Sequence, residues 1–490
     1  MPGVAFDALL VGAYAAILSA VYLPTLATTY ARVDDYATMA GAIDGSLASG
    51  LAVQIPEGRP LYDLYEQLTF GHLHTVGEVV GLRVISLVAL LALAFLLSKY
   101  LRKLGAGLGP VVLVPLFVVV MPPLALYQTW ASLSPYALAA LVSAAGSLLT
   151  DRGISLPEHR WRYFAGATAC VLVAAAIYQP AAAYLWLFAG ARFILVPATP
   201  RNRWAEVGVK VAITASGLLL DFLASLVLPY AIYGHRIASP RSSVATDPLS
   251  KLSDFGRALG DSLNMTKIVP SIALAILASV VIVTGIAVRS RWSPRRAMVF
   301  GSEFAVAVVA AVMAYCPNLV TTLNWPAYRT QGALTALVAL YATFAVVSIG
   351  DQWESRYATS VTAGVLSVLV GVGALFAYRD VSAEITKPES LQWWYMREKV
   401  QAASQLRGVE VLDLVPAASV YGFAPVVRYD EFGYPTSAVP VALQDMAYVA
   451  LAGTPPAFQH RVKVTVTNAP VASPGTYVID MRTLVQYPLS

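Results

Sequence analysis

Charged residues are scarce in this chain: only 12% of its 490 residues are Asp, Glu, Lys or Arg, about half the share found in soluble domains. Hydrophobic residues make up 58%, and the mean hydropathy is +0.65. A soluble core does not require so much apolar surface, whereas a lipid bilayer accepts it. The composition therefore excludes an ordinary soluble protein and predicts an integral membrane protein.

Cysteine and histidine are also rare, with two and five copies. Cys170 and Cys316 are isolated, and only His72 and His74 lie close together, so the spacing of a disulfide framework or a zinc site is missing. The C-terminal part after residue 380 contains no GxGxxG, P-loop or GxSxG motif. The net charge of +5 arises from cations in short loops between apolar runs, which set membrane orientation. We therefore expect no nucleic-acid partner.

Apolar runs of roughly 17–25 residues mark membrane spans. The sequence predicts a polytopic all-α protein with about eleven of them, at 7–28, 82–98, 108–126, 131–149, 163–178, 181–197, 207–231, 268–288, 298–315, 332–349 and 358–378.

The cations between these runs predict the orientation. About fifteen Lys and Arg fall in five loops, at 99–103, 151–162, 192–210, 289–296 and 351–357. The short loops 122–130 and 316–331 carry only Arg329. Because cations stay on the side that is not translocated, the N-terminus is expected in the cytoplasm and the C-terminus on the periplasmic or extracytoplasmic face of the inner (plasma) membrane.

Residues 163–191 allow two interpretations: one long tilted helix, or a hairpin of two short ones. A single helix would place Arg192 to Lys210 outside and reverse all later spans. Tyr178-Gln179-Pro180 provides a break in mid-run, and the charge count also favours the hairpin.

Three polar segments then face outward: 29–81, 232–267 and everything after Tyr378. We expect a membrane domain over 1–380, with 29–81 and 232–267 as outer loops, and a small extracytoplasmic α/β domain over 381–490. In the latter, alternation predicts strands at 409–415, 460–467 and 476–480, and helices at 388–406 and 441–450.

The first outer loop holds the adjacent carboxylates Asp34 and Asp35. Two such groups at a membrane surface repel, and one of them can act as a general base or hold a divalent cation. The alternative is a solvated turn that ends the first helix. Further along, Leu61, Leu64 and Leu68 share one face of a helix that Pro60 starts, which predicts an amphipathic helix in the interface plane. Another interfacial helix is expected at 249–263.

Isolated charges mark other candidates. Arg329 is the only cation of its outer loop, and Arg83 stands at the outer mouth of the second span, so both are candidates for an anionic headgroup or phosphate. Asp221 and Glu303 lie within spans, where a carboxylate must be neutral, paired or facing a cavity.

Four short motifs carry a resemblance over most of the chain: Asp34-Asp35-Tyr36, Gly58-Arg59-Pro60-Leu61, Tyr178-Gln179 and Asp430-Glu431-Phe432-Gly433. In their order and outward placement the chain resembles the GT-C class of membrane glycosyltransferases, most closely the GtrII-type O-antigen glucosyltransferases.

The resemblance implies a polyprenyl-phosphate sugar donor, a glycan or lipopolysaccharide acceptor, and inversion at the sugar. Asp34 or Asp35 would be the base, and Arg59, Arg83 and Arg329 would meet the donor phosphate. Tyr36, Tyr178 and Gln179 would bind phosphate or sugar. No cofactor follows with certainty, and a divalent cation, Mg²⁺ or Mn²⁺, bridging the phosphate and Asp34–Asp35 stays open. A non-catalytic membrane scaffold, or a transporter or polymerase of lipid-linked oligosaccharides, is the alternative.

Overall fold

The computed structural model describes residues 2–47, 54–235, 237, 239, 243–264, 272–290, 296–322, 327–352, 357–417, 435–470 and 473–486. The helices of the membrane part are α1 (Pro2–Ala27), α2 (Val33–Ile43), α4 (Pro60–Thr69), α5 (Val80–Lys103), α6 (Leu108–Val119), α7 (Pro122–Thr129), α8 (Ser134–Ser155), α9 (Arg160–Ala182), α10 (Leu185–Leu195), α11 (Pro200–Tyr233), α12 (Pro248–Leu263), α13 (Ile272–Ser290), α14 (Arg296–Val320), α15 (Tyr328–Gly350) and α16 (Ala358–Arg379).

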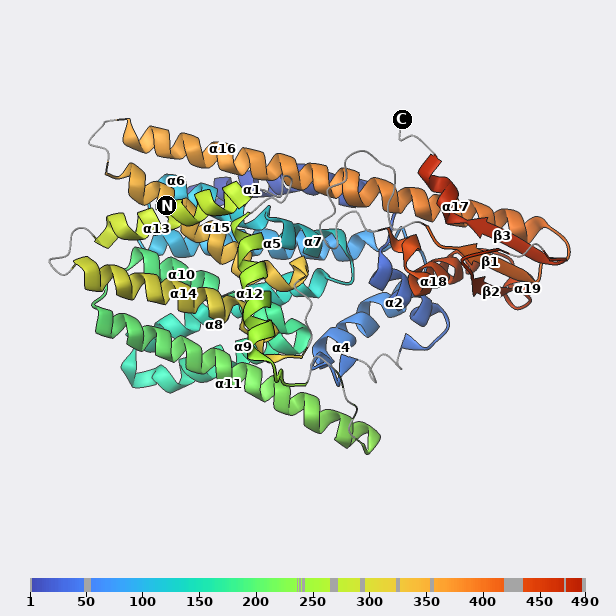
Figure 1. The fold of residues 1–490 in the computed structure, drawn as a ribbon, viewed down its shortest axis with the longest axis horizontal. Helices are drawn as coiled ribbons and strands as arrows, with labels where there is room; N and C mark the ends of the chain where they lie inside the picture. The colour runs from blue at the N-terminus through green and yellow to red at the C-terminus, as the bar shows by residue number, and fades with distance from the viewer. Residues whose placement is uncertain are drawn as a thin grey trace.

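Most of these helices form one elongated bundle with roughly parallel axes (Figure 1). Within the described residues, nine helices are long and apolar enough to cross a membrane. The predicted span 108–126 is instead a broken pair, α6 and α7, bent by 58° at Pro122. The predicted span 181–197 contains only the 11 residues of α10, about 16 Å of helix, which is too short to cross a bilayer alone.

The chain reverses direction after α9, as the hairpin interpretation predicts, although α10 is too short to be its second span. α9 leaves helical geometry at Tyr178, with φ −161° and ψ 108°, and α10 returns toward the end of the bundle from which α9 came. Asp151, near the end of α8, contacts both Arg192 of α10 (3.8 Å) and Lys210 of α11 (2.8 Å). These ion pairs place the ends of α8 and α10 and the first turns of α11 at the same end of the bundle.

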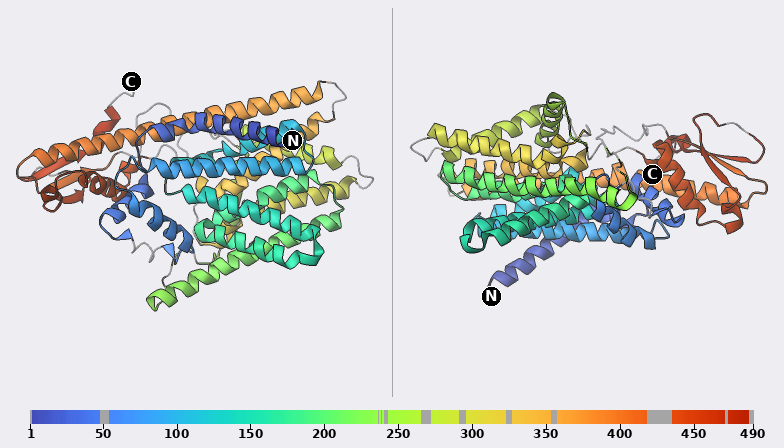
Figure 2. Two further views of the ribbon diagram at one scale, coloured as in Figure 1. Left: turned by 180° about the vertical axis from the view of Figure 1, so that it is seen from behind. Right: turned by 90° about the horizontal axis from the view of Figure 1, so that it is seen from below.

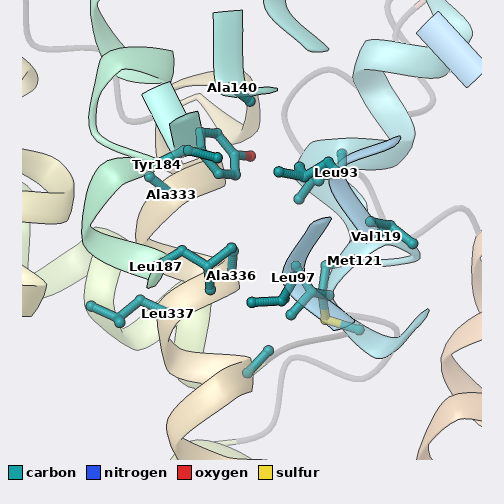
Figure 3. Close-up of a cluster of buried hydrophobic side chains, with 14 of the residues drawn as sticks. Leu93, Leu97, Val119, Met121, Ala140, Tyr184, Leu187, Ala333, Ala336 and Leu337 are labelled. Atoms are coloured by element: carbon teal, nitrogen blue, oxygen red, sulfur yellow. The ribbon is translucent and has the colours of Figure 1, made fainter. Parts of the chain in front are cut away.

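The apolar core lies around α15, which is buried over most of its length. Side chains from five helices and the α6–α7 bend meet there (Figure 3): Leu93, Leu97, Val119, Met121, Ala140, Tyr184, Leu187, Ala333, Ala336 and Leu337. α10 is enclosed in the same core, so its short length and the irregular turn before it are shielded from lipid.

α16 continues without a break into α17 (Lys387–Gln405) through a π-helical stretch, Asp380–Thr386. The predicted domain boundary at 380/381 therefore falls inside a continuous helix. At 48 residues, Ala358–Gln405 is about 72 Å long and extends beyond one end of the bundle (Figures 1 and 2).

The C-terminal part forms a small three-stranded parallel sheet on this extension, with strand order β2-β1-β3. The three predicted strands and the two predicted helices are confirmed. The elements are β1 (Val411–Val415), α18 (Pro440–Leu451), α19 (Pro456–Gln459), β2 (Lys463–Val466) and β3 (Thr476–Asp480). The motif Asp430-Glu431-Phe432-Gly433 lies outside the described residues.

α2 and α4, from the segment 29–81, lie at the same end of the bundle as the C-terminal part (Figure 1). α4 exposes Leu64 and Leu68, whereas its polar residues Tyr62, Asp63 and Glu66 are buried. α12 confirms the helix predicted at 249–263; Asp247 caps its first turn, and it runs across the axes of the bundle.

Candidate functional site

Asp35 is fully buried and holds two parts of the chain together. Its carboxylate accepts backbone N–H groups from Arg32 (3.0 Å) and Ser132 (2.8 Å). The first bond closes the start of α2, and the second ties α2 to the turn before α8. Burial raises the pKa of Asp35 above its ordinary value. With both oxygens facing the chain, this carboxyl acts as an anchor of the fold.

Asp34 points elsewhere, because neighbouring side chains on a helix diverge by about 100°. Its side chain is 42% exposed, and it forms an ion pair with Arg329 at 3.1 Å. Arg329 comes from the first turn of α15 and is itself only 10% exposed. Of the acidic pair, Asp34 is therefore the carboxylate that a bound molecule can reach.

Trp130, in the turn between α7 and α8, holds two guanidinium groups. Arg32 lies 4.4 Å and Arg329 5.2 Å from the centre of its ring. Arg32 also faces Glu389 of α17 at 3.8 Å, and both side chains are buried. These contacts fix Arg329 in position and connect the start of α2 to the helix that carries the C-terminal sheet.

Arg59 caps α4 and is 8% exposed. Its guanidinium contacts the Tyr136 hydroxyl at 3.5 Å and the Gln179 side-chain oxygen at 3.4 Å, and it lies 4.9 Å from the Tyr178 ring centre. Glu57 is its ion-pair partner at 3.7 Å. The motifs at 58–61 and 178–179 are thus in direct contact.

The break in α9 makes this contact possible. Since Tyr178 leaves helical geometry, its ring stacks on Tyr136, with centroids 3.7 Å apart and planes 6° apart. Gln179 then donates to the backbone oxygens of Glu57 (2.8 Å) and Gly58 (3.0 Å). The break therefore serves to hold the turn that presents Arg59.

Arg59 and Arg329 lie close enough for their charges to repel each other. Two buried guanidinium groups whose charges interact, with an exposed carboxylate beside one of them, form a place where an anion is stabilised. We call this group, Asp34, Arg59, Arg329, Tyr178 and Gln179, the candidate site.

A mostly apolar groove of about 490 Å³ adjoins the candidate site. Glu57, Gly58 and Gln179 line its polar end, together with Asp221 of α11. Apolar residues of α11 and α14 form most of its walls, among them Ala215, Leu218, Leu219, Phe222, Met313 and Val320. Leu219 and Val320 in its walls are exposed, so the groove opens onto the surface of these two apolar helices.

Asp221 and Glu303, the two carboxylates expected within spans, lie in different places. Asp221 is 4% exposed and accepts a hydrogen bond from Gln179 at 3.3 Å, so it supports the candidate site. Glu303 pairs with Arg203 at 3.7 Å, at the other end of the bundle.

Arg83 and Tyr36 are occupied by other contacts. Arg83 donates to the backbone oxygens of Thr25 (3.3 Å) and Tyr30 (2.7 Å) and stacks on the Tyr30 ring, which holds the turn after α1. Tyr36 is buried against Trp393 of α17, with ring centroids 5.9 Å apart. Neither side chain reaches the candidate site.

Glu66 was not among the candidates from the sequence, yet its buried carboxyl lies beside Asp34. It accepts a hydrogen bond from Thr38 at 3.0 Å, and burial raises its pKa to about 7. Trp130 was also missed. The signal for Glu66 was its place on the polar face of the amphipathic helix 60–68, but which face is buried could not be read from that pattern.

No group of three or more His, Cys, Asp or Glu side chains in the described part of the chain is arranged to hold a metal ion. Asp34 and Asp35 point to different partners and do not chelate together. No protein-family model and no curated protein matches the sequence.

Proposed function

We propose that the chain is an inverting glycosyltransferase that moves a sugar, glucose by its resemblance, from a polyprenyl-phosphate donor to a cell-surface glycan or lipopolysaccharide acceptor outside the membrane. One observation supports the proposal: an exposed carboxylate, Asp34, and two buried guanidinium groups, Arg59 and Arg329, lie near an apolar groove, and Arg59 contacts Gln179 and Glu57 at the polar end of that groove. A base, a phosphate site and a lipid slot are what this reaction requires.

Each charged side chain of the candidate site has one role in this reaction. Asp34 accepts the proton of the acceptor hydroxyl as that oxygen bonds to the anomeric carbon of the sugar. The bond from this carbon to the phosphate oxygen breaks, and its electron pair leaves with the lipid phosphate. Arg59 and Arg329 stabilise the negative charge on this leaving group. Attack opposite the leaving phosphate inverts the anomeric centre.

The groove suits the lipid tail of such a donor. Its walls are almost entirely aliphatic and aromatic side chains of α11 and α14, and its polar end is held by the same Gln179 that contacts Arg59. A prenyl chain in the groove would bring its phosphate toward the two guanidinium groups. Burial of the tail contributes about 0.8 kcal/mol per CH₂ group, so the donor would bind mainly through its lipid.

Sugar transfer in liposomes tests the proposal. The purified protein would receive radiolabelled polyprenyl-phosphate glucose and a lipopolysaccharide acceptor, beside Asp34→Asn and the control Asp44→Asn, an exposed carboxylate at the end of the same helix. We expect Asp34→Asn to lose about 10²–10⁴-fold in rate, the usual contribution of a general base, and Asp44→Asn to stay active.

The other outcomes are equally clear. If Asp34→Asn still transfers sugar, the chain is a glycosyltransferase but Asp34 is not its base. Absence of transfer by the native protein, across a panel of lipid-linked sugars and acceptors, would replace the proposal by a scaffold or transport role.

A further inference from the structure

Glu66 is a buried carboxyl with an unusual set of partners. It is 7% exposed, and the Thr38 hydroxyl of α2 donates a hydrogen bond to it, while the Tyr62 hydroxyl of its own helix lies nearby. Among the described residues no cation forms an ion pair with it. Asp35 is different, since its backbone N–H partners can only donate and therefore favour the ionised form.

A hydroxyl accommodates either protonation state, because it can donate to a carboxylate or accept from a carboxylic acid. Thr38 shows how this works: its Oγ lies 3.0 Å from the Glu66 carboxyl and 2.8 Å from the backbone oxygen of Asp34. The single hydroxyl proton can serve only one of them. When Glu66 is protonated it can donate to Thr38, and Thr38 then donates to Asp34.

The titratable side chains around Glu66 are mostly acidic groups, which are either negative or neutral. They are Tyr62 and Asp63 on its own helix, Asp34 on α2, and Tyr136 on α8, with Arg329 reaching the cluster as the partner of Asp34. An anion entering the candidate site adds negative charge to this cluster. A buried carboxyl with no cationic partner then favours the neutral form.

We infer that Glu66 takes up a proton when an anionic headgroup enters the candidate site, so that donor binding is coupled to protonation of this buried side chain. This rests on the proposed function for the identity of the anion, a lipid phosphodiester. The proton removes a charge next to Asp34 and returns the Thr38 hydroxyl to the Asp34 backbone, which stiffens the start of α2 as the donor arrives. The raised pKa of Glu66, about 7, places the effect near neutral pH.

The test measures binding of methyl farnesyl phosphate, a lipid phosphodiester whose single charge does not change between pH 6 and 9. Because binding takes up one proton, we expect the Kd to weaken by about tenfold between pH 6.5 and 8.5. In Glu66→Gln the Kd should be the same at both values. Asp44→Asn is the control: Asp44 is an exposed carboxylate at the far end of α2, and its variant should keep the native pH dependence.

Titration calorimetry of the native protein, in two buffers of different ionisation enthalpy, counts the protons directly and does not depend on any variant folding. Uptake of about 0.7 proton near pH 7.5 supports the inference, because a carboxyl with a pKa of about 7 is already partly protonated there. Zero uptake, or a pH dependence that persists in Glu66→Gln, overturns it while leaving the glycosyltransferase proposal intact if sugar transfer depends on Asp34. If the native protein neither binds the phosphodiester nor transfers sugar, both fail together.

Discussion

Asp35 accepts backbone N–H groups from residues that are about a hundred positions apart, and it is fully buried. Asparagine keeps one acceptor oxygen but turns an N–H₂ group toward donors. We expect Asp35→Asn to lower stability by about 2–3 kcal/mol, the usual loss when a charged hydrogen bond is removed in the interior. Thermal unfolding in detergent measures this. Unchanged stability combined with lost sugar transfer would instead point to Asp35 as the base.

Glu66 predicts a pH-dependent stability. Its pKa in the folded protein is about 7, against an ordinary value of 4.5, so the folded state keeps a proton that the unfolded chain releases. The free energy of unfolding therefore decreases as the pH rises from about 4.5 to 7, and this carboxyl causes no further change at higher pH. Glutamine does not titrate, so the unfolding free energy of Glu66→Gln should lack this decrease. Between pH 4.5 and pH 8 the variant should therefore become more stable relative to the native protein by up to about 3 kcal/mol.

Unfolding temperatures of both proteins across this range test the prediction. A constant difference between the two curves would contradict it. The sequence alone could place Glu66 on a polar helix face, but its raised pKa depends on burial against α2. That contact joins residues 28 positions apart, and no local pattern reports it.

At the scale of elements, the turn before α4 depends on Gly58. Its φ is +75°, and a Cβ there would lie 2.6 Å from the Gln179 amide nitrogen. Gly58→Ala should push Gln179 away, release Arg59 and reduce donor affinity by about tenfold, while backbone strain adds a stability loss of about 1–3 kcal/mol.

Gly45→Ala separates these two effects. Gly45 has a similar φ, +78°, but nothing within 4 Å of the added Cβ. It should reproduce the strain and leave donor affinity unchanged. Equal affinities for the two variants would mean that the Gln179–Arg59 contact does not contribute to binding.

The groove between α11 and α14 predicts how donor binding depends on the length of the polyprenyl tail. Ala215 lines it and is exposed, so Ala215→Trp should fill the groove without disturbing the core. We expect the KM to rise at least tenfold for a donor with a long polyprenyl tail, and much less for a ten-carbon donor whose tail ends before the new indole ring. Leu220→Trp, exposed on the same helix and outside the groove, is the control.

Several elements could be predicted because their signals are local. Apolar runs gave the helices of the bundle, and Tyr178-Gln179-Pro180 gave the hairpin. α4 shows the limit of such signals. Its amphipathic pattern was visible, but in the structure the polar face is buried and the leucines are exposed, because α2 and the ends of α8 and α9 supply polar partners. The pattern defines two faces and does not say which one meets the protein.

For the whole molecule, the parts that could not be predicted are contacts across long sequence separations. The Asp34–Arg329 ion pair joins residues 295 positions apart, and the Arg32–Glu389 pair joins the first outer loop to α17. From the sequence, both Asp34 and Asp35 were candidates for the base. Arg83 was a candidate for binding the donor phosphate, as were Arg59 and Arg329. Only the fold distinguishes side chains that face the candidate site from those that hold the chain together.

The two ends of the molecule predict its orientation in the membrane. Arg192 and Lys210 meet Asp151 at one end of the bundle, whereas α2, α4 and the C-terminal sheet lie at the other (Figure 1). We therefore expect the second end to face out. In a variant lacking both native cysteines, Glu398→Cys on exposed α17 should react with an impermeant maleimide in intact cells. Glu158→Cys, exposed between α8 and α9, should react only after permeabilisation. The reverse labelling would place the candidate site in the cytoplasm, where a flipped lipid-linked donor could not reach it.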